Sequence, residues 1–447
     1  MTNVLAIVSI HDEQNVIAFH PEQKNGIELM KVSQGTVQFG QAICKVYYKL
    51  DPNIKINEMG ISINLINSLK IPTTLEYEIR YDQHQNILKV GPCIGILASK
   101  TNGKLKRKLN VLRRYLRQYS EINGCIIVFS LEGIDFNSKK INGFMYKPDT
   151  KSWKRGIFLF PAAVLRRRIS LSKEKSRAFR SAFGHCYINN KTFNKWEMYQ
   201  WLSTNETVNC YLPPTLLYQH PMDLIQFIST YNCVYLKPLT GMMGRQIIKV
   251  TKKDDSYEVS TSKNKKLHLH STNELMDYCK QSLIPNKYII QKALDLTIIE
   301  DHMIDFRVVI IKNKVGDWEY VGSIARYGTF KGIVSNYAAG GKLYNPQQLL
   351  QLAFNISEEE ASNLENQMAI VAIKAAAELE KYDIQFHKYG VDIALDINRQ
   401  IWLIEMNHRY LSDSVFKLIG QPQKDMTLKL NTMLFAKYIA GFANENG

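Results

Sequence analysis

The chain has 447 residues, a length that suggests two to four domains. It is 45% hydrophobic and 22% charged, which is the composition of a soluble globular protein. No apolar run reaches membrane-spanning length, and the N-terminus lacks the basic start and long apolar stretch of a signal peptide, so we expect a cytoplasmic protein. The seven cysteines are scattered without a Cys-X-X-Cys or Cys/His cluster, which argues against a zinc site and a disulfide framework.

The formal net charge of +16 is concentrated in residues 104–117 and 139–180. Such basic runs bind nucleic acid, an anionic surface or an acidic substrate, or they form the solvated faces of helices. Within residues 104–117 four leucines recur at helical spacing, which favours a solvated helix face there. No recognisable nucleic-acid motif accompanies the charge.

Residues 1–90 contain short β-rich stretches separated by Asn and Gly, without a long helical period. Strands are expected at residues 4–10, 35–46, 60–65, 75–80 and 87–90. This pattern predicts a small, barrel-like β domain without catalytic residues.

The pattern changes at Gly91-Pro92. Residues 93–99 (CIGILAS) and 125–130 (CIIVFS) read as buried strands, and an amphipathic helix is expected between them at residues 104–119. Strand, helix and strand at this spacing predict a βαβ unit with parallel pairing. No glycine-rich dinucleotide fingerprint follows the first strand, so we predict no cofactor site there.

Two lysines stand at the starts or ends of predicted elements. Lys195 lies near the start of a helix predicted at residues 191–202, where the alternative is an ordinary surface lysine. Lys237 ends a strand and precedes a loop with Gly241 and Gly244, whose backbone N–H groups could close over phosphates. The simpler alternative is a hairpin with glycines in its turn. The loop is not a Walker A motif, because no Gly-Lys-Ser/Thr follows.

Two arginines, Arg307 and Arg326, lie on consecutive predicted strands joined by a turn at residues 312–317. Side by side they would repel each other unless an anion lay between them, and the alternative is a pair of separate surface side chains. A helix with a capping box from Ser357 and Glu360 is expected at residues 357–381. A C-terminal amphipathic helix is expected at residues 425–442.

Residues 389–408 (YGVDIALDINRQIWLIEMNH) read as two apolar strands joined by a tight turn. Asp392 lies on the first strand, and Glu405 and Asn407 share one face of the second. Antiparallel pairing would bring these side chains together, and two carboxylates with an amide oxygen suit a Mg²⁺ ion that also holds phosphate. A half-buried hairpin with solvated acids is the alternative.

These features, in this order, resemble the YheC/YheD group of ATP-grasp proteins, which is associated with the bacterial endospore coat. The resemblance covers residues 90–445 and rests on the motifs KWEMYQWL, YLPPT, YLKPLTGMMGR, DFRVVI, ARYG, GVDIALD and IWLIEMN. It implies a mixed α+β and α/β multidomain fold: a small N-terminal β domain (1–90), a Rossmann-like pre-ATP-grasp βαβ domain (91–190) and an ATP-grasp domain (191–447). The chain departs from the group at Gln246, where glycine is usual, and at Asn407-His408, where Asn-Ser is usual.

The resemblance implies a Mg²⁺- and ATP-dependent ligase that activates a carboxylate as an acylphosphate for attack by an amine or a thiol. Its partners would be ATP, the carboxylate substrate and the acceptor, with a peptide, a spore-envelope component or an acidic polymer as candidates, in the cytoplasm or at the spore coat. The alternative is a catalytically silent spore-coat binding or scaffold protein that keeps the fold.

The resemblance also implies roles for individual residues. Asp392, Glu405 and Asn407 would bind the metal, and Arg307 and Arg326 would be catalytic. A strand at residues 288–294 matches the adenine hinge, with Gln291 where glutamate is commoner, and residues 335–342 are similar to a substrate-covering loop of bacterial glutathione synthetase. The implied nucleotide- and substrate-binding residues are Lys195, Lys237, Gly241, Gly244, Gln291, Leu294, Asn336, Gly340 and Gly341.

Overall fold

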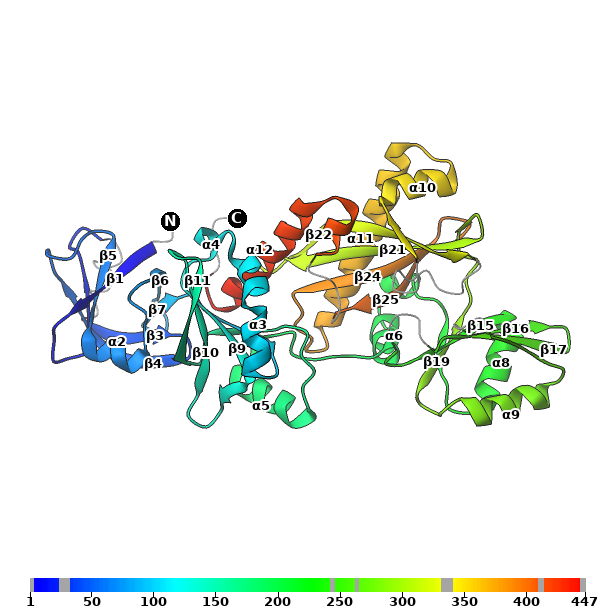
Figure 1. Ribbon diagram of the computed structural model, residues 1–447, viewed down its shortest axis with the longest axis horizontal. Coiled ribbons are helices and arrows are strands. Elements are labelled where there is room, and N and C mark those ends of the chain that lie inside the picture. The colour runs from blue at the N-terminus through cyan, green and yellow to red at the C-terminus, as the bar shows by residue number, and fades with distance from the viewer. Residues whose placement is uncertain are drawn as a thin grey trace.

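The computed structural model describes residues 4–23, 33–241, 246–261, 265–330, 341–408 and 414–442. It arranges them as an elongated row of sheets with helices on their faces (Figure 1). A barrel occupies one end, a second sheet lies in the middle, and two further sheets form the other end. From the second sheet the chain runs to the third sheet at the far end, returns through the fourth sheet and ends with its C-terminal helix near the middle.

Seven strands close the N-terminal barrel in the order β1-β5-β2-β4-β3-β7-β6, and β6 pairs back to β1. The expected barrel-like arrangement is therefore observed, with one local difference. Residues 60–65 are divided between β5 and helix α2 (Ile63–Leu69), because Leu65 and Leu69 bury one side of a helix. The strands are β1 (Val4–Ile10), β2 (Val16–Phe19), β3 (Gln34–Phe39), β4 (Ala42–Leu50), β5 (Glu58–Ser62), β6 (Glu76–Asp82) and β7 (Ile87–Gly91).

The second sheet contains the expected βαβ unit, in which β8 (Cys93–Ser99) and β9 (Cys125–Asp135) pair in parallel. The predicted helix between them is divided into α3 (Asn102–Leu112), the 3₁₀ turn η1 (Arg113–Leu116) and α4 (Tyr119–Ile122). Its leucines face the sheet, as their spacing predicts. The sheet order is β11-β10-β9-β8-β12-β13, with β10 (Lys140–Lys147), β11 (Ser152–Leu159), β12 (Ala163–Arg166) and β13 (Tyr187–Ile188), and α5 (Lys173–Phe183) lies between β12 and β13 in the chain.

The third sheet has the order β14-β19-β15-β16-β17-β18 and carries two helices that bury its core. Its antiparallel pairing matches the strand, loop and return strand predicted around Lys237. The elements are β14 (Thr215–Leu217), α8 (Pro221–Tyr231), β15 (Cys233–Pro238), β16 (Ile248–Lys253), β17 (Ser256–Thr261), β18 (Lys266–Leu269), α9 (Thr272–Ser282) and β19 (Tyr288–Lys292).

The fourth sheet has the order β23-β22-β21-β24-β25, and one of its faces is covered by α10 and α11. Helix α11 has the predicted capping box of Ser357 and Glu360. The elements are β20 (Ile298–Ile299), β21 (His302–Lys312), β22 (Trp318–Phe330), β23 (Lys342–Tyr344), α10 (Pro346–Phe354), α11 (Glu358–Glu380), β24 (Lys388–Leu395) and β25 (Ile401–Asn407). Helices α6 (Lys195–Ser203) and α7 (Glu206–Asn209) precede the third sheet.

The expected C-terminal helix is present as α12 (Pro422–Ile439), and it is buried on more sides than the amphipathic pattern indicated, because Asp425, Lys429 and Lys437 are buried as well. It lies between the second and fourth sheets, where Met433 joins the core of the former and Leu428 that of the latter. Its Lys437 forms a buried ion pair with Glu78 of the barrel. The domain boundary at residue 190 stays a prediction, and α12 packs on both sides of it.

Candidate functional site

Charged side chains form a row across the face of the fourth sheet that α10 and α11 do not cover. The strand register places Arg307 opposite Asp392, and Asp392 opposite Glu405. On the next strand pair, Arg326 lies opposite Asp305. Directly opposite residues of antiparallel strands share a face, so the register alone gathers these five side chains.

The two arginines do have an anion between them, and it is the carboxylate of Asp392. Arg307 donates from Nε and Nη2 to the two Asp392 oxygens at 2.8 Å each, and Arg326 Nη2 lies 3.0 Å from Asp392 Oδ2. Arg326 also binds Asp305 through Nε at 2.6 Å and through Nη2. Asp392 and Arg326 are each only 7% exposed, so these charges depend on one another.

The electrostatic balance at Asp392 favours the ionised carboxylate. Burial by itself would raise the pKa of this group, but the guanidinium groups of Arg307 and Arg326 outweigh burial and hold the pKa below its ordinary value. Burial by itself would lower the pKa of Arg326, but the carboxylates of Asp305 and then Asp392 outweigh burial and hold it above the ordinary arginine value.

A β-bulge places Glu405 on the charged face. Asp392 lies opposite Glu405, whereas Ile393 lies opposite Leu403, so Ile404 is an extra residue on β25. In a regular strand Leu403 and Glu405 would point to the same face, because side chains alternate with a period of two. The extra residue leaves Leu403 buried in the core beside α11 and turns Glu405 toward the charged row.

Lys195 joins three segments that are far apart in the sequence. Its ammonium group lies 2.9 Å from Glu405 Oε1 and donates to the Gly241 carbonyl oxygen at 3.1 Å. The lysine is the first residue of α6, whose N-terminus is fixed by a capping box between Asn194 and Glu197. The predicted position of Lys195 at the head of this helix is thus observed, and the helix directs it toward the hairpin.

Lys237 is held by a chain of side-chain hydrogen bonds on the third sheet. Its ammonium group donates to Gln291 Oε1 at 2.6 Å, and Gln291 Nε2 donates to Thr215 Oγ1 at 2.9 Å. Burial, and next the positive charge of Lys195, lower the pKa of Lys237 to about 8, while Glu405 and Asp392 oppose this shift. The side chain of Gln291 therefore positions Lys237, and the adenine-binding role of its strand stays a prediction.

The three predicted metal ligands lie together. Asn407 Nδ2 donates to Asp392 Oδ2 at 3.1 Å, and Glu405 faces Asp392 across the strand pair. Within the described ranges, no three His, Cys, Asp or Glu side chains gather into a metal-binding group. A cation here would be held by two carboxylates and the Asn407 carbonyl oxygen, which are hard oxygen ligands that fit Mg²⁺ with water and phosphate completing its shell.

Some predicted residues are not placed by the structure. Gly244, Asn336 and Gly340 lie outside the described residues, whereas Gly341 is buried immediately before β23. Gln246 has a φ of +61°, a left-handed conformation that favours glycine, so this departure from the family pattern strains the backbone locally.

His408 belongs to the second departure from the family pattern. It lies against the rings of Phe193 and Phe386, in an aromatic cluster beside the end of β25.

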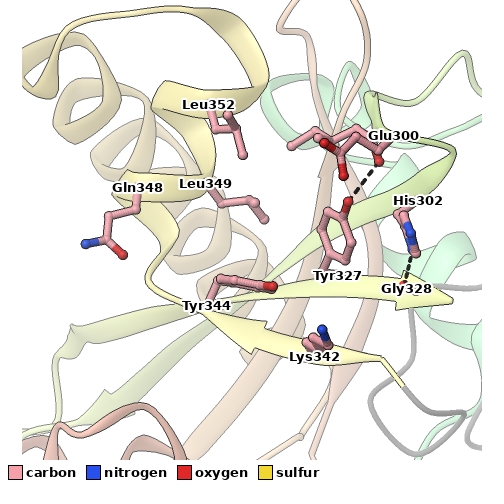
Figure 2. A pocket seen from close by; sticks show the side chains of 10 residues that line it. Glu300, His302, Tyr327, Gly328, Lys342, Tyr344, Gln348, Leu349 and Leu352 are labelled. Carbon is pink, nitrogen blue, oxygen red and sulfur yellow. Dashed lines mark hydrogen bonds between the residues drawn. The ribbon is translucent and has the colours of Figure 1, made fainter. Parts of the chain in front are cut away.

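A separate pocket of about 560 Å³ lies on the opposite face of the fourth sheet, next to α10 (Figure 2). Tyr327 follows Arg326 in β22 and so points away from the charged row, and His302 stacks on its ring with centroids 4.4 Å apart. Leu349 and Leu352 of α10 lie across the pocket from them. None of the residues predicted for the site lines this pocket, although Tyr327 and Gly328 belong to the ARYG motif and Lys342 ends the 335–342 loop singled out in the sequence.

Asp305 is the functional candidate that sequence analysis missed. It lies two residues before Arg307, so strand alternation puts both on one face, and its carboxylate binds Arg326. The two-residue spacing between Asp305 and Arg307 is the feature of the sequence that could have identified Asp305. Tyr344, which borders the pocket, has no comparable signal in the sequence.

Comparison with known proteins agrees with these features. Residues 184–439 match the model of the YheC/D-like ATP-grasp family. The endospore coat-associated protein YheD of Bacillus subtilis (strain 168) is 22% identical over 422 residues, covering 89% of this chain and 88% of YheD. YheC of the same organism is 22% identical over 237 residues, covering 52% of this chain and 64% of YheC.

Solved structures with similar folds include the ADP complex of the N5-carboxyaminoimidazole ribonucleotide synthetase purK, with 13% identity and a TM-score of 0.41 over 76% of this chain and 78% of that one. D-alanyl-alanine synthetase A of Vibrio cholerae O1 biovar eltor shows 12% identity and a TM-score of 0.42 over 76% of this chain and 98% of that one. The family match covers more than half of the chain and confirms the expected fold class. The chain belongs to the YheC/D-like ATP-grasp family.

Proposed function

We propose that the protein is a Mg²⁺- and ATP-dependent ligase that joins a carboxylate to an amine or a thiol. The observation that carries the proposal is the contact of Lys195 with both Glu405 and Gly241, which brings α6, the glycine loop and the hairpin to one point. In the proposed reaction a substrate carboxylate oxygen attacks the γ-phosphorus of ATP, and ADP leaves. The acceptor then attacks the acyl carbon of the acylphosphate, and inorganic phosphate leaves.

The residues divide between holding ATP and neutralising the group in transfer. Lys195 and Lys237 would bind phosphate oxygens, and Asp392, Glu405 and Asn407 would hold Mg²⁺, which neutralises phosphate charge when bound. Arg307 contacts Asp392 through Nε and Nη2, so its Nη1 edge can face a phosphoryl oxygen. Arg326, held between two carboxylates, fixes Asp392 in position.

The scaffold alternative has one observation in its favour. Asp392 accepts hydrogen bonds from two guanidinium groups and an amide, which compete with a metal for its oxygens. ADP release, measured with ATP, Mg²⁺ and a panel of amino acids and acidic peptides, distinguishes the two functions. ADP release that is stimulated by any carboxylate–acceptor pair supports the ligase. ATP binding without ADP release in the presence of every pair supports the scaffold.

ATP binding is expected to require Mg²⁺. Without the cation, the carboxylates of Asp392 and Glu405 face the polyphosphate and repel it. Titration calorimetry in excess Mg²⁺ should therefore give a much lower Kd than titration in EDTA. Equally tight binding in EDTA would remove the metal assignment from these residues.

ATP affinity is expected to fall as the pH rises through about 8, where Lys237 loses its proton. The protonated fraction drops from about 90% at pH 7 to about 10% at pH 9, so affinity should weaken up to about tenfold.

In the free protein the same depressed pKa of Lys237 makes the free energy of unfolding rise between about pH 8 and 10.5, because the unfolded chain still binds this proton there.

Lys237→Met supplies the test of this assignment. The variant should bind ATP weakly at pH 7 and show no further loss between pH 7 and 9. A variant whose affinity keeps the parent's pH dependence would assign the titration to another group.

A further inference from the structure

The excess positive charge of the chain lies in one part of it. Residues 91–190 contain 21 of the 57 Lys and Arg residues but 5 of the 41 Asp and Glu residues. Their net charge of +16 equals that of the whole chain, so the other 347 residues are neutral on balance. If the charge served solubility alone, it would not need to collect in the second sheet and its helices.

Much of this charge forms a basic strip, defined as the exposed Lys and Arg side chains of residues 104–117 on α3 and η1. Among the residues that the structure describes, none of these side chains belongs to an ion pair. Their helix buries Leu105, Leu112 and Leu116 against the sheet, so the charges cannot turn inward. The basic strip is a fixed, solvent-facing array.

The turn between β10 and β11 extends the basic strip. Arg113 Nη1 donates to the Lys151 carbonyl oxygen at 3.2 Å, and Trp153 Nε1 donates to the Leu109 carbonyl oxygen at 3.1 Å. These bonds hold the turn alongside the helix, so the exposed Lys151 continues the line of positive charge.

The basic strip lies beside the end of β12, which contacts the segment that leads to Lys195. Lys108 donates to the Ala98 carbonyl oxygen at 3.1 Å, and the Arg167 guanidinium lies over the ring of Tyr115, 5.1 Å from its centroid, so Arg167 lies beside the helical segments that carry the basic strip. The preceding residue, Arg166, donates to the Lys191 carbonyl oxygen at 3.3 Å, four residues before Lys195. A ligand on the basic strip therefore lies on the side of the second sheet that leads to Lys195 and Glu405.

The surroundings favour one class of anionic partner. The apolar side of α3 is already buried, so a membrane could be attracted only by charge and not by insertion. Tyr115 is buried, and the exposed large apolar side chain on α3 is the aliphatic Val111, so the basic strip offers no aromatic platform on which bases could stack. A carboxylate-activating enzyme, in contrast, needs a partner that carries carboxylates.

We propose that the basic strip binds an acidic polypeptide and guides one of its carboxylates to the active site, which rests on the ligase function proposed above. The 11 residues of α3 and the four of η1 span about 25 Å. An extended peptide covers this length with about seven residues. Binding should therefore strengthen with peptide length up to about seven acidic residues and change little beyond that.

Fluorescence anisotropy with labelled oligoglutamate peptides of three to twelve residues tests the proposal without any turnover. The test variant is Lys104→Gln/Arg107→Gln/Arg114→Gln, which neutralises three exposed side chains of the basic strip. The matched control is Lys45→Gln/Lys314→Gln/Lys374→Gln, which removes the same charge from exposed positions elsewhere. Circular dichroism establishes that both variants are folded.

The parent and the control should bind the eight-residue oligoglutamate alike, and the test variant should bind it on the order of tenfold more weakly at low salt. Glu405→Gln should bind it as the parent does, so failure of the ligase function would leave this result standing. The proposal would be overturned if the parent bound oligoglutamine as tightly as oligoglutamate, or if the test variant bound oligoglutamate as tightly as the parent. It would also be overturned if the parent bound a single-stranded oligonucleotide or anionic vesicles of matched charge more tightly than oligoglutamate.

Discussion

Glu405→Gln is expected to remove ATP turnover, by about a hundredfold or more, while leaving the fold intact. The carboxylate lies at the junction of Lys195, the glycine loop and Asp392, so its loss removes a proposed metal ligand and the partner of a proposed phosphate-binding lysine. Glutamine keeps the size and the hydrogen-bonding oxygen, so only the charge changes.

The cost to stability should be small. Glu405 is one-third exposed and pairs with Lys195, and such partly solvated ion pairs contribute less than about 1 kcal/mol. Its pairing also means that repulsion from neighbouring carboxylates does not dominate, so the variant should unfold slightly below the parent in EDTA. In Mg-ATP the parent should gain thermal stability by ligand binding and the variant should not.

Glu258→Gln is the matched control, because Glu258 also forms an ion pair with lysine, here with Lys253 and Lys266, but lies on the third sheet away from the charged row. It should keep full turnover and the stabilisation by Mg-ATP. The site assignment would be falsified if Glu405→Gln retained turnover within a factor of about ten, or if it were stabilised by Mg-ATP as strongly as the parent.

The hairpin shows how far periodicity carries a prediction. Alternating apolar residues and a turn segment predicted two paired strands, and the structure pairs β24 with β25 in this way. The extra residue Ile404 could not be predicted, because a bulge depends on which register buries more apolar surface across neighbouring strands. Sequence reasoning placed Glu405 beside Asp392, but it had no basis for separating Glu405 from Leu403.

Long-range contacts set the limit for the site as well. Lys195 and Glu405 are 210 residues apart, and nothing local in the sequence indicates that they touch. The two arginines were predicted as a pair, but the anion between them was left open, and it is Asp392. Charge complementarity within one protein depends on tertiary register, whereas sequence patterns report mainly on neighbours along a strand or a helix.

Arg326→Ala is expected to lower the free energy of unfolding by about 3–5 kcal/mol. Arg326 is buried, and its removal leaves Asp305 without its guanidinium partner and Asp392 with only one. Urea denaturation measures the loss directly. Any decrease in turnover must then be measured well below the unfolding transition, because instability alone would reduce it.

Arg307→Ala is the comparison that separates burial from charge. Its side chain is 22% exposed, against 8% for Arg326, and Asp392 would keep its contact with Arg326. Arg307→Ala should therefore cost clearly less stability than Arg326→Ala, although both remove one arginine from the same row.

The double variant Asp305→Ala/Arg326→Ala completes the test. Removing both partners leaves no buried carboxylate at position 305, so the double variant should lose less stability than the sum of the two single variants. Additive losses would mean that Asp305 and Arg326 do not depend on each other. Arg326 would then be available to the phosphoryl group in transfer, instead of holding Asp392 in place.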